Sequence, residues 1–125
     1  MALQYVGGAT ATKAGATTGT STISLTSLTG GISSSAAAGD IVIAAYAGGA
    51  GGAVTFEITD GTNEYTLIAP QQYRNGSIYD TNLRVAYKIM GSAPDTSVTF
   101  GPTKWANDAG AMAVHVWRGV NLTTP

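Results

Sequence analysis

Cysteine is absent from this chain. Its absence excludes disulfide bonds and thiolate metal sites, and it leaves the redox compartment open. Charge is scarce as well, because Asp, Glu, Lys and Arg make up only 10% of the residues, against about a quarter in typical soluble domains. The six basic residues are scattered and form no run that could neutralise a row of phosphates. Nothing in the sequence therefore supports nucleic acid as a partner.

Long apolar runs are missing too. No window approaches the ~18 to 20 uninterrupted apolar residues that a membrane-spanning helix needs. The N-terminal stretch MALQYVGGATATKAG lacks the basic cluster and apolar core of a signal peptide. We therefore expect no membrane partner and no conventional export. Release in an assembled particle such as a virion would be another way to work outside a cell.

Glycine, alanine, serine and threonine are abundant in place of charge. A surface built from them is neutral and rich in hydroxyl groups, or it is partly covered by other protein. The 125 residues suffice for one hydrophobic core and are too few for two ordinary domains. We expect a Gly/Thr-rich arm over residues 1–20, which pairs with a neighbour or anchors to a shell. A single domain would then follow over residues 21–125.

Strands are predicted where apolar and polar residues alternate and β-branched or aromatic residues are frequent. The segments concerned are residues 21–28, 40–46, 54–59, 64–69, 83–89, 96–100 and 111–118. Helical spacing is nowhere sustained for the ~10 residues that a helix would need. About eight short strands joined by turns predict an all-β fold. The fold class is an antiparallel β-sandwich, and jelly-roll and immunoglobulin-like topologies both stay open.

The faces of these strands differ in character. Residues 83–89 alternate most cleanly, which is typical of a half-buried strand. Their two faces consist of Leu83, Val85, Tyr87 and Ile89, and of Arg84, Ala86 and Lys88. Residues 40–46 and 111–118 are instead apolar on both faces, and Ala113, His115 and Trp117 form the outward side of the latter. We expect a second layer or a neighbouring subunit to cover that side.

The stretch VTFEITDGTNEYTLIAP contains the densest group of oxygen-bearing side chains. Asp60, Asn63 and Glu64 are ligand types that Ca²⁺ favours, but their spacing departs from the calcium-loop pattern. Asp60 followed by Gly61 supplies the side-chain capping and positive φ that a hairpin turn needs. We interpret the stretch as a turn and predict no metal site there.

The hairpin interpretation also predicts a local core. With the chain reversed at residues 60–63, Phe56 and Ile58 would pack together with Tyr65 and Leu67.

Catalysis has few candidates. A nucleophilic triad would need His115, the single histidine, as its base, yet His115 lies in mid-strand and no Gly-x-Ser-x-Gly motif occurs. Four aspartates lie beside Gly, Pro or Asn at predicted turns, where carboxylates cap backbone amides. Glu57 alone lies on the polar face of a strand. We predict no catalytic residue, no cofactor and no enzymatic activity.

Aromatic side chains are the remaining candidates for binding. Tyr73, Tyr79 and Trp105 fall in predicted loops, and Trp117 lies on the outward face of the last strand. Exposed rings stack on sugars in carbohydrate-binding modules and anchor subunits to one another. The alternative is that these rings close the edges of the core.

Four segments, read in order, resemble a recurrent β-sandwich module of phage virion proteins and related bacterial surface proteins. They are GDIVIAAYAG, VTFEITDGTNEYTLIA, TNLRVAYKIMGSAPDTSVTF and AMAVHVWRGVNLTTP. The module has a Gly-Asp before an apolar strand, a hairpin with Asp-Gly-x-Asn, a strand ending in a Pro/Gly turn, and a closing strand with Trp-Arg-Gly. The resemblance covers residues 39–125. Because the module continues beyond the position of Pro125, we expect a C-terminus that is trimmed or ends early.

The resemblance implies a structural or adhesive protein without enzymatic activity, located on a virion as a decoration, fibre-associated or tail-associated component. It also implies homo-oligomers and contacts with other virion proteins. The alternative is a carbohydrate-binding or host-receptor-binding module that uses Tyr73, Tyr79, Trp105 and Trp117 on host surface glycans.

Overall fold

The computed structural model describes residues 2–13, 19–50, 57–70, 72–74, 80–103 and 109–121. Every regular element among them is a strand. The strands are β1 (Gln4–Lys13), β2 (Gly19–Ser24), β3 (Ile41–Ala50), β4 (Ile58–Thr59), β5 (Thr66–Leu67), β6 (Gln72–Arg74), β7 (Asp80–Ile89), β8 (Ser97–Thr103) and β9 (Gly110–Arg118).

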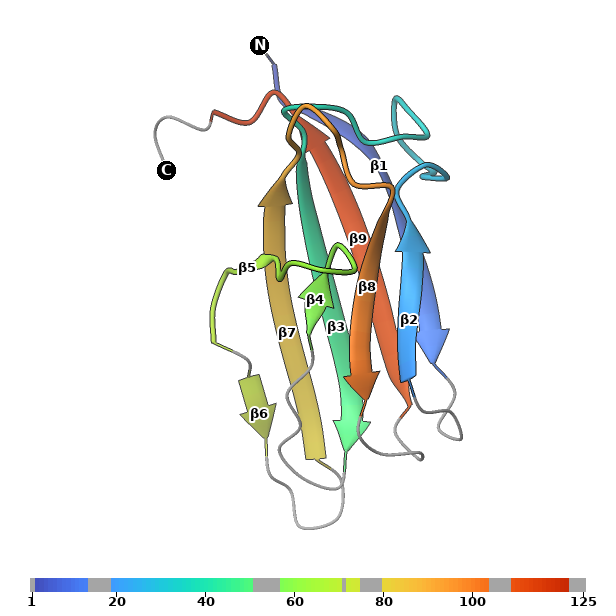
Figure 1. The fold of residues 1–125 in the computed structure, drawn as a ribbon, viewed down its shortest axis with the longest axis vertical. Helices are drawn as coiled ribbons and strands as arrows, with labels where there is room; N and C mark the ends of the chain where they lie inside the picture. The colour runs from blue at the N-terminus through green and yellow to red at the C-terminus, as the bar shows by residue number, and fades with distance from the viewer. Residues whose placement is uncertain are drawn as a thin grey trace.

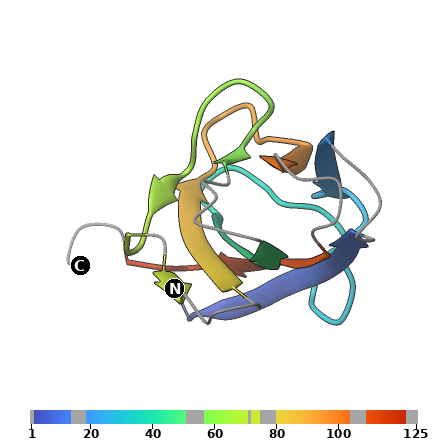
Figure 2. The same ribbon diagram turned by 90° about the horizontal axis from the view of Figure 1, so that it is seen from below.

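Two antiparallel sheets form the two layers of a sandwich (Figures 1 and 2). The large sheet has the order β1-β9-β3-β7-β5, with β6 pairing β7 along the same edge as β5. The small sheet has the order β2-β8-β4. The prediction of an all-β antiparallel sandwich is therefore confirmed.

The strand pairs are nested around residues 60–63. β1 pairs β9, β2 pairs β8 and β3 pairs β7, while Thr59 and Glu64 form a bridge at the innermost turn. The chain is thus one long hairpin rolled into two sheets, which is the arrangement of a jelly roll. An immunoglobulin-like sandwich would instead pair its first strand with its second. Of the two topologies that the sequence left open, these long-range pairings match the jelly roll.

The hydrophobic core lies between the two sheets. Tyr46 of β3 and Phe100 of β8 are 1% exposed, and their ring centroids lie 6.5 Å apart across the sandwich. The ring of Tyr46 lies beneath Gly48 and Gly110, where a Cβ atom at either position would collide with it. Those two glycines therefore make room for the largest buried side chain in the core.

β1 belongs to the sandwich. It pairs with β9 from Gln4 opposite Arg118 to Lys13 opposite Gly110, and Val6 is completely buried. Gly8 and Thr29 exchange backbone hydrogen bonds of 2.9 and 3.0 Å, which tie β1 to the loop after β2. The segment expected as an arm, residues 1–20, thus contains β1 and the start of β2, and its role as an arm stays a prediction. The inward side chains of β1 are mostly small, so the sequence pattern gave a weak strand signal.

The innermost turn matches the hairpin interpretation. Asp60 Oδ1 accepts hydrogen bonds from the backbone N–H groups of Thr62 (2.9 Å) and Asn63 (2.7 Å), and Gly61 has a φ of +100°. Ile58 and Tyr65 are buried and joined by a 2.8 Å backbone hydrogen bond. Leu67, by contrast, is 37% exposed and lies outside that core, and Phe56 lies outside the described residues.

Candidate functional site: the outer face of the large sheet

The orientation of β7 is the first unexpected feature. Apolar and polar residues alternate along β7 as predicted, but the face that carries Arg84 and Lys88 points toward the inside of the sandwich. Arg84 is 6% exposed and Ala86 is completely buried, whereas Leu83 and Ile89 are 44% and 41% exposed. The half-buried strand expected over residues 83–89 thus buries the face of Arg84 and Ala86 and exposes its apolar face.

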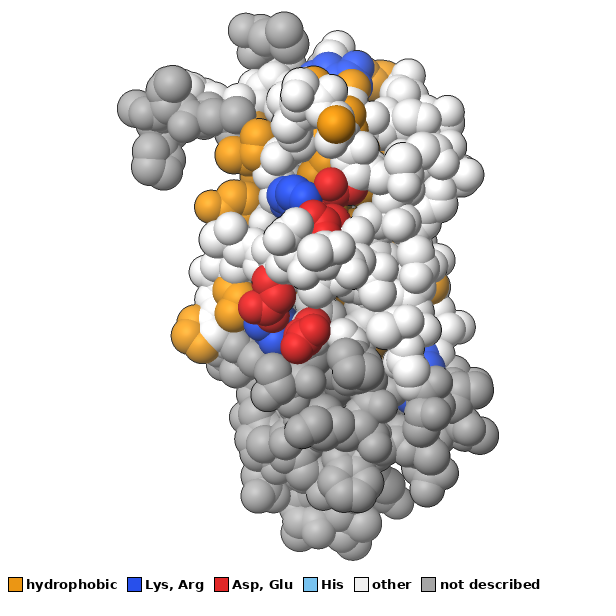
Figure 3. All heavy atoms as spheres, viewed as in Figure 1, with side chains coloured by type: hydrophobic (Ala, Val, Ile, Leu, Met, Phe, Trp, Pro, Cys, Tyr) orange, Lys and Arg blue, Asp and Glu red, His pale blue; other side chains and the backbone are white. Residues whose placement is uncertain are grey.

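Ion pairs explain this orientation. Arg84 Nη2 donates to Glu64 Oε1 at 3.0 Å, and Lys88 Nζ lies 2.7 Å from Asp60 Oδ2 and 2.8 Å from Asp95 Oδ2. These acidic partners lie in the turns before and after β7 in the chain. Figure 3 shows acidic and basic side chains side by side on this part of the surface. Arg84 and Lys88 are thus held by ion pairs to residues in and beside the innermost turn and to Asp95.

Several pKa values follow from this cluster. The N–H groups of Asn63 and Thr62, together with Lys88, hold the pKa of Asp60 well below its usual range. Burial and the neighbouring Asp95, which accepts a 3.0 Å hydrogen bond from the Tyr65 hydroxyl, raise the pKa of Tyr65 well above its usual range. Burial lowers the pKa of Lys88, but its hydrogen bonds to Asp60 and Asp95 outweigh burial, so the net direction is upward.

The opposite side of β7 joins a flat field of side chains that we call the outer array. It consists of the outward positions of β1, β9, β3 and β7, in four rows across the sheet. The rows are Tyr5, Trp117, Ile41 and Ile89; Gly8, His115, Ile43 and Tyr87; Thr10, Ala113, Ala45 and Val85; and Thr12, Ala111, Ala47 and Leu83.

The outer array contains no Asp, Glu, Lys or Arg. Most of its side chains are apolar, and they are half-buried or exposed. An antiparallel sheet with one solvated face normally carries polar residues there. A contiguous apolar field of this kind is a candidate interaction surface. The prediction that Ala113, His115 and Trp117 face away from the core is confirmed, because Met112, Val114 and Val116 are buried.

Aromatic side chains dominate one corner of the outer array. The rings of Tyr5 and Trp117 lie 4.9 Å apart at an angle of 51°, and the Tyr5 hydroxyl lies 3.2 Å from His115 Nδ1, within hydrogen-bond distance. The hydroxyl of Tyr5 lies over Gly8, where a Cβ atom would collide with it. Gly8 thus leaves room for the Tyr5 side chain beside Trp117 and His115.

Side-chain size falls from the first row to the fourth on β9 and β3, whereas β1 has Gly8 in its second row and β7 keeps Leu83 in its fourth. On β1, β9 and β3 the first row has Tyr5, Trp117 and Ile41, and the fourth has Thr12, Ala111 and Ala47. A shallow hollow of about 490 Å³ lies at the end of the strands beside the fourth row, lined by those three small residues and also by the inward-facing Lys13 and Asn82. The outer array therefore has a raised end and a hollow end.

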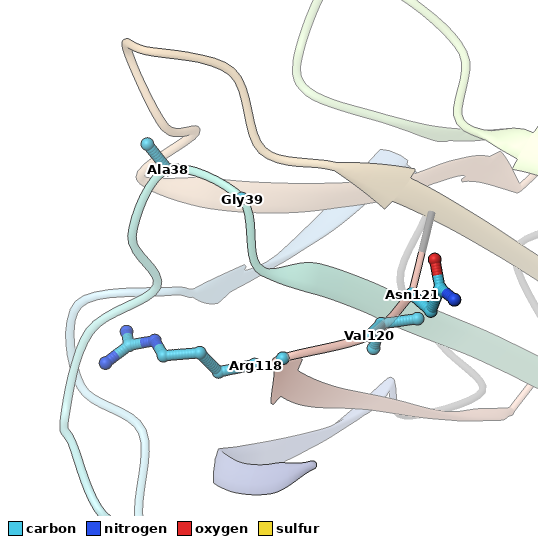
Figure 4. Close-up of a pocket in the computed structure, with 6 residues that line it drawn as sticks. Ala38, Gly39, Arg118, Val120 and Asn121 are labelled. Atoms are coloured by element: carbon cyan, nitrogen blue, oxygen red, sulfur yellow. The ribbon is translucent and has the colours of Figure 1, made fainter. Parts of the chain in front are cut away.

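A second hollow, of about 560 Å³, lies at the end of β9 (Figure 4). Arg118, which lines it, donates from Nε and Nη2 to the two carboxylate oxygens of Asp40 at 2.8 and 2.9 Å. Asp40 has no solvent exposure, and its Oδ2 also accepts a 2.8 Å hydrogen bond from the N–H of Ala37. The hydrogen bonds and charge of Asp40 raise the pKa of Arg118, although burial opposes them. This ion pair joins the Gly-Asp and Trp-Arg-Gly motifs, so their charged residues have a structural role.

The structure describes the side chain of only one of the four aromatic residues predicted to bind a ligand. Trp117 lies half-buried in the outer array. Tyr73 belongs to β6 opposite Asn82, but its side chain lies outside the described residues, as do Tyr79 and Trp105. The structure adds Tyr5, which the sequence pattern missed because it lies in the segment interpreted as an arm. Its only sequence signal was an aromatic residue two positions from a Gly-Gly pair.

Comparisons with protein-family models, with curated proteins and with solved structures give no match to this chain. Within the described ranges, no three His, Asp or Glu side chains gather as metal ligands would. The described residues also form no helix that could cross a membrane. The outer array is thus the feature on which a function can be argued.

Proposed function

We propose that this chain is a non-enzymatic structural subunit of a phage particle, attached to the capsid or the tail through burial of the outer array against protein. The phage setting comes from the motifs shared with virion modules. The observation that carries the structural role is the uncharged, apolar outer array itself. Burial of such a face is favourable by roughly 25 cal/mol for each Å² removed from water, and it needs no particular hydrogen-bond partner.

The distribution of charge supports this role. The described charged side chains of β7 are engaged in ion pairs on the inner side, which leaves the outer array free of desolvation costs for charge. Charged residues are characteristically depleted in the centre of protein interfaces. Jelly rolls also occur in viral capsid and lectin domains, although a fold alone does not determine a function.

Particles purified from the source organism test this proposal. An antibody against the chain should label the head or the tail at regular positions in electron micrographs. Ala113→Lys, which places a charge in the middle of the outer array, should reduce incorporation. Thr22→Lys is the matched control, because Thr22 is exposed on β2 of the small sheet. Recovery of the wild-type chain only as free protein would contradict the proposal.

A second candidate function is binding of host glycans, for which the Tyr5 and Trp117 rings offer a stacking surface. A glycan array probed with the wild-type chain and with Trp117→Ala tests it. Binding that is lost in the variant would support a carbohydrate-binding module. Equal signals for both proteins would contradict a role for this aromatic pair.

A further inference from the structure

We propose that the partner of the outer array is a second copy of this chain, packed face to face about a two-fold axis that runs across the strands. The inference deepens the proposed function by naming the partner. It rests on one part of that function, namely that protein covers the outer array, and it does not depend on the phage setting.

Charge favours a second copy. Two copies that meet through the same surface bring two patches of the same net charge together, so any net charge on that surface would repel itself. The outer array carries no carboxylate, ammonium or guanidinium group. A partner of different sequence would have no need for such neutrality, because it could carry the opposite charge. The uncharged array is therefore compatible with self-association at every position.

The size of the outer array is sufficient for a dimer. Strands about 4.8 Å apart, with a rise of about 3.4 Å per residue, make an array of four strands and eight residues roughly 19 Å by 27 Å, or about 500 Å². Two copies together then bury about 1,000 Å², which reaches the lower limit of specific interfaces. The exposed Ile68, whose N–H bonds to the carbonyl of Val85, extends the apolar margin beside β7.

The taper of the array fixes the direction of the axis. A two-fold axis across the strands, between the second and third rows, places the first row of one copy over the fourth row of the other. Trp117 then lies above Ala111 of the second copy, and Tyr5 lies above its Thr12. The raised end of each copy enters the hollow end of the other, twice in one dimer. Aligned sheets of this kind pack at about −30°.

The other possible axis direction gives a poor fit. An axis parallel to the strands, midway across the array, would place the first row against the first row, so that Trp117 meets Ile41 and Tyr5 meets Ile89 of the other copy. The hollows would then face each other and leave an unfilled gap. Interfaces pack as densely as protein interiors, and gaps forfeit the contacts that their lining would make. The across-strand axis is therefore the one that the side-chain sizes support.

Complementary charges at one position test the self-pairing. At a protein concentration of about 100 µM, which exceeds the micromolar dissociation constants of the weakest ~1,600 Å² interfaces, light scattering should give the wild-type chain twice its mass of 12.6 kDa. Ala113→Lys and Ala113→Glu should each be monomeric, with dissociation constants raised about 100-fold by like charges beside the axis. An equimolar mixture of the two should recover the dimer mass, and Thr22→Lys should remain dimeric.

An exchange of large and small side chains tests the axis direction. Trp117→Ala and Ala111→Trp should each weaken the dimer about tenfold or more, as changes at well-packed interface centres do. Ala111→Trp combined with Trp117→Ala in one chain should restore association, because the new Trp lies over the new Ala of the other copy. Circular dichroism establishes that each variant is folded. A double variant no tighter than either single variant would overturn the across-strand axis.

The outcomes separate this inference from the proposed function. A wild-type chain that stays monomeric at these concentrations overturns the dimer, and so do Ala113→Lys and Ala113→Glu variants that remain dimeric alone. If such a monomeric chain is nevertheless found in particles, the proposed function stands without the dimer. A dimer with the expected variant behaviour that is absent from particles leaves this inference intact and contradicts the phage setting.

Discussion

At the scale of single residues, Asp40 has the most demanding environment among the described carboxylates. It has no solvent exposure, and Arg118 compensates its charge through two parallel hydrogen bonds. Neither residue was assigned this role from the sequence, because 77 residues separate them and only the pairing of β3 with β9 brings them together.

Arg118→Ala should lower the free energy of unfolding by about 3 to 5 kcal/mol, since it leaves a buried carboxylate without its counter-ion. Arg118→Lys should lower the free energy of unfolding by less, because lysine keeps the positive charge but cannot make the bidentate hydrogen bonds. Urea unfolding followed by circular dichroism measures both. Equal stability of Arg118→Ala and the wild-type chain would contradict a structural role for this pair.

Asp60 predicts a dependence of stability on pH. The pKa of Asp60 in the folded state lies below that of an unfolded aspartate. Its contribution to the free energy of unfolding is therefore complete above about pH 5 and is lost as the pH falls. Asp60→Asn keeps an oxygen for the Thr62 and Asn63 amides but loses the charge that pairs with Lys88. The variant should be less stable by about 1 to 2 kcal/mol near pH 7.

Urea unfolding between pH 7 and pH 2 tests this prediction. The stability of Asp60→Asn should fall less steeply with acid than that of the wild-type chain. Two parallel curves would show that Asp60 makes no such contribution.

At the scale of elements, alternation located most strands but could not orient all of them. The inward side of β9 follows from Met112, Val114 and Val116, and it is confirmed. The orientation of β7 could not be predicted from its alternation, because the partners of Arg84 and Lys88 come from other parts of the chain. Alternation with a period of two residues shows that the two faces of a strand differ in polarity. Which face is buried depends on the residues that pack against it.

β1 shows the other limit of pattern reasoning. Its inward positions include Val6, Ala9 and Ala11, and its remaining residues are mostly Gly and Thr, a composition shared with linkers. Only its register with β9 shows that it is a strand. The part of the outer array on β3 and β9 could therefore be predicted from sequence, and the part on β1 could not.

Removal of β1 tests its place in the sandwich. Deletion of residues 2–13 should abolish cooperative unfolding, because it exposes the edge of β9 and removes the buried Val6. Deletion of Ala2 and the 62% exposed Leu3 is the matched control and should have little effect. Thermal denaturation distinguishes the two. A folded, equally stable chain without residues 2–13 would support the arm interpretation instead.

At the scale of the whole molecule, the nested strand pairs place two chemically different faces on opposite sides. The small sheet carries exposed Ser and Thr residues such as Ser24 and Thr22, and the ion pairs cluster around the innermost turn. The large sheet presents the uncharged outer array. The jelly-roll topology was not predictable from local patterns, because it depends on pairings between residues far apart in the chain, such as Gln4 with Arg118.

The most direct test of the central claim, that the outer array is buried against a second copy, is the molecular mass in solution as a function of protein and salt concentration. We expect twice 12.6 kDa at high protein concentration. The mass should persist at about 1 M salt, where ionic contacts between copies would be screened and apolar ones would not. A mass of 12.6 kDa at every concentration, or a dimer that dissociates when salt is added, would contradict the claim.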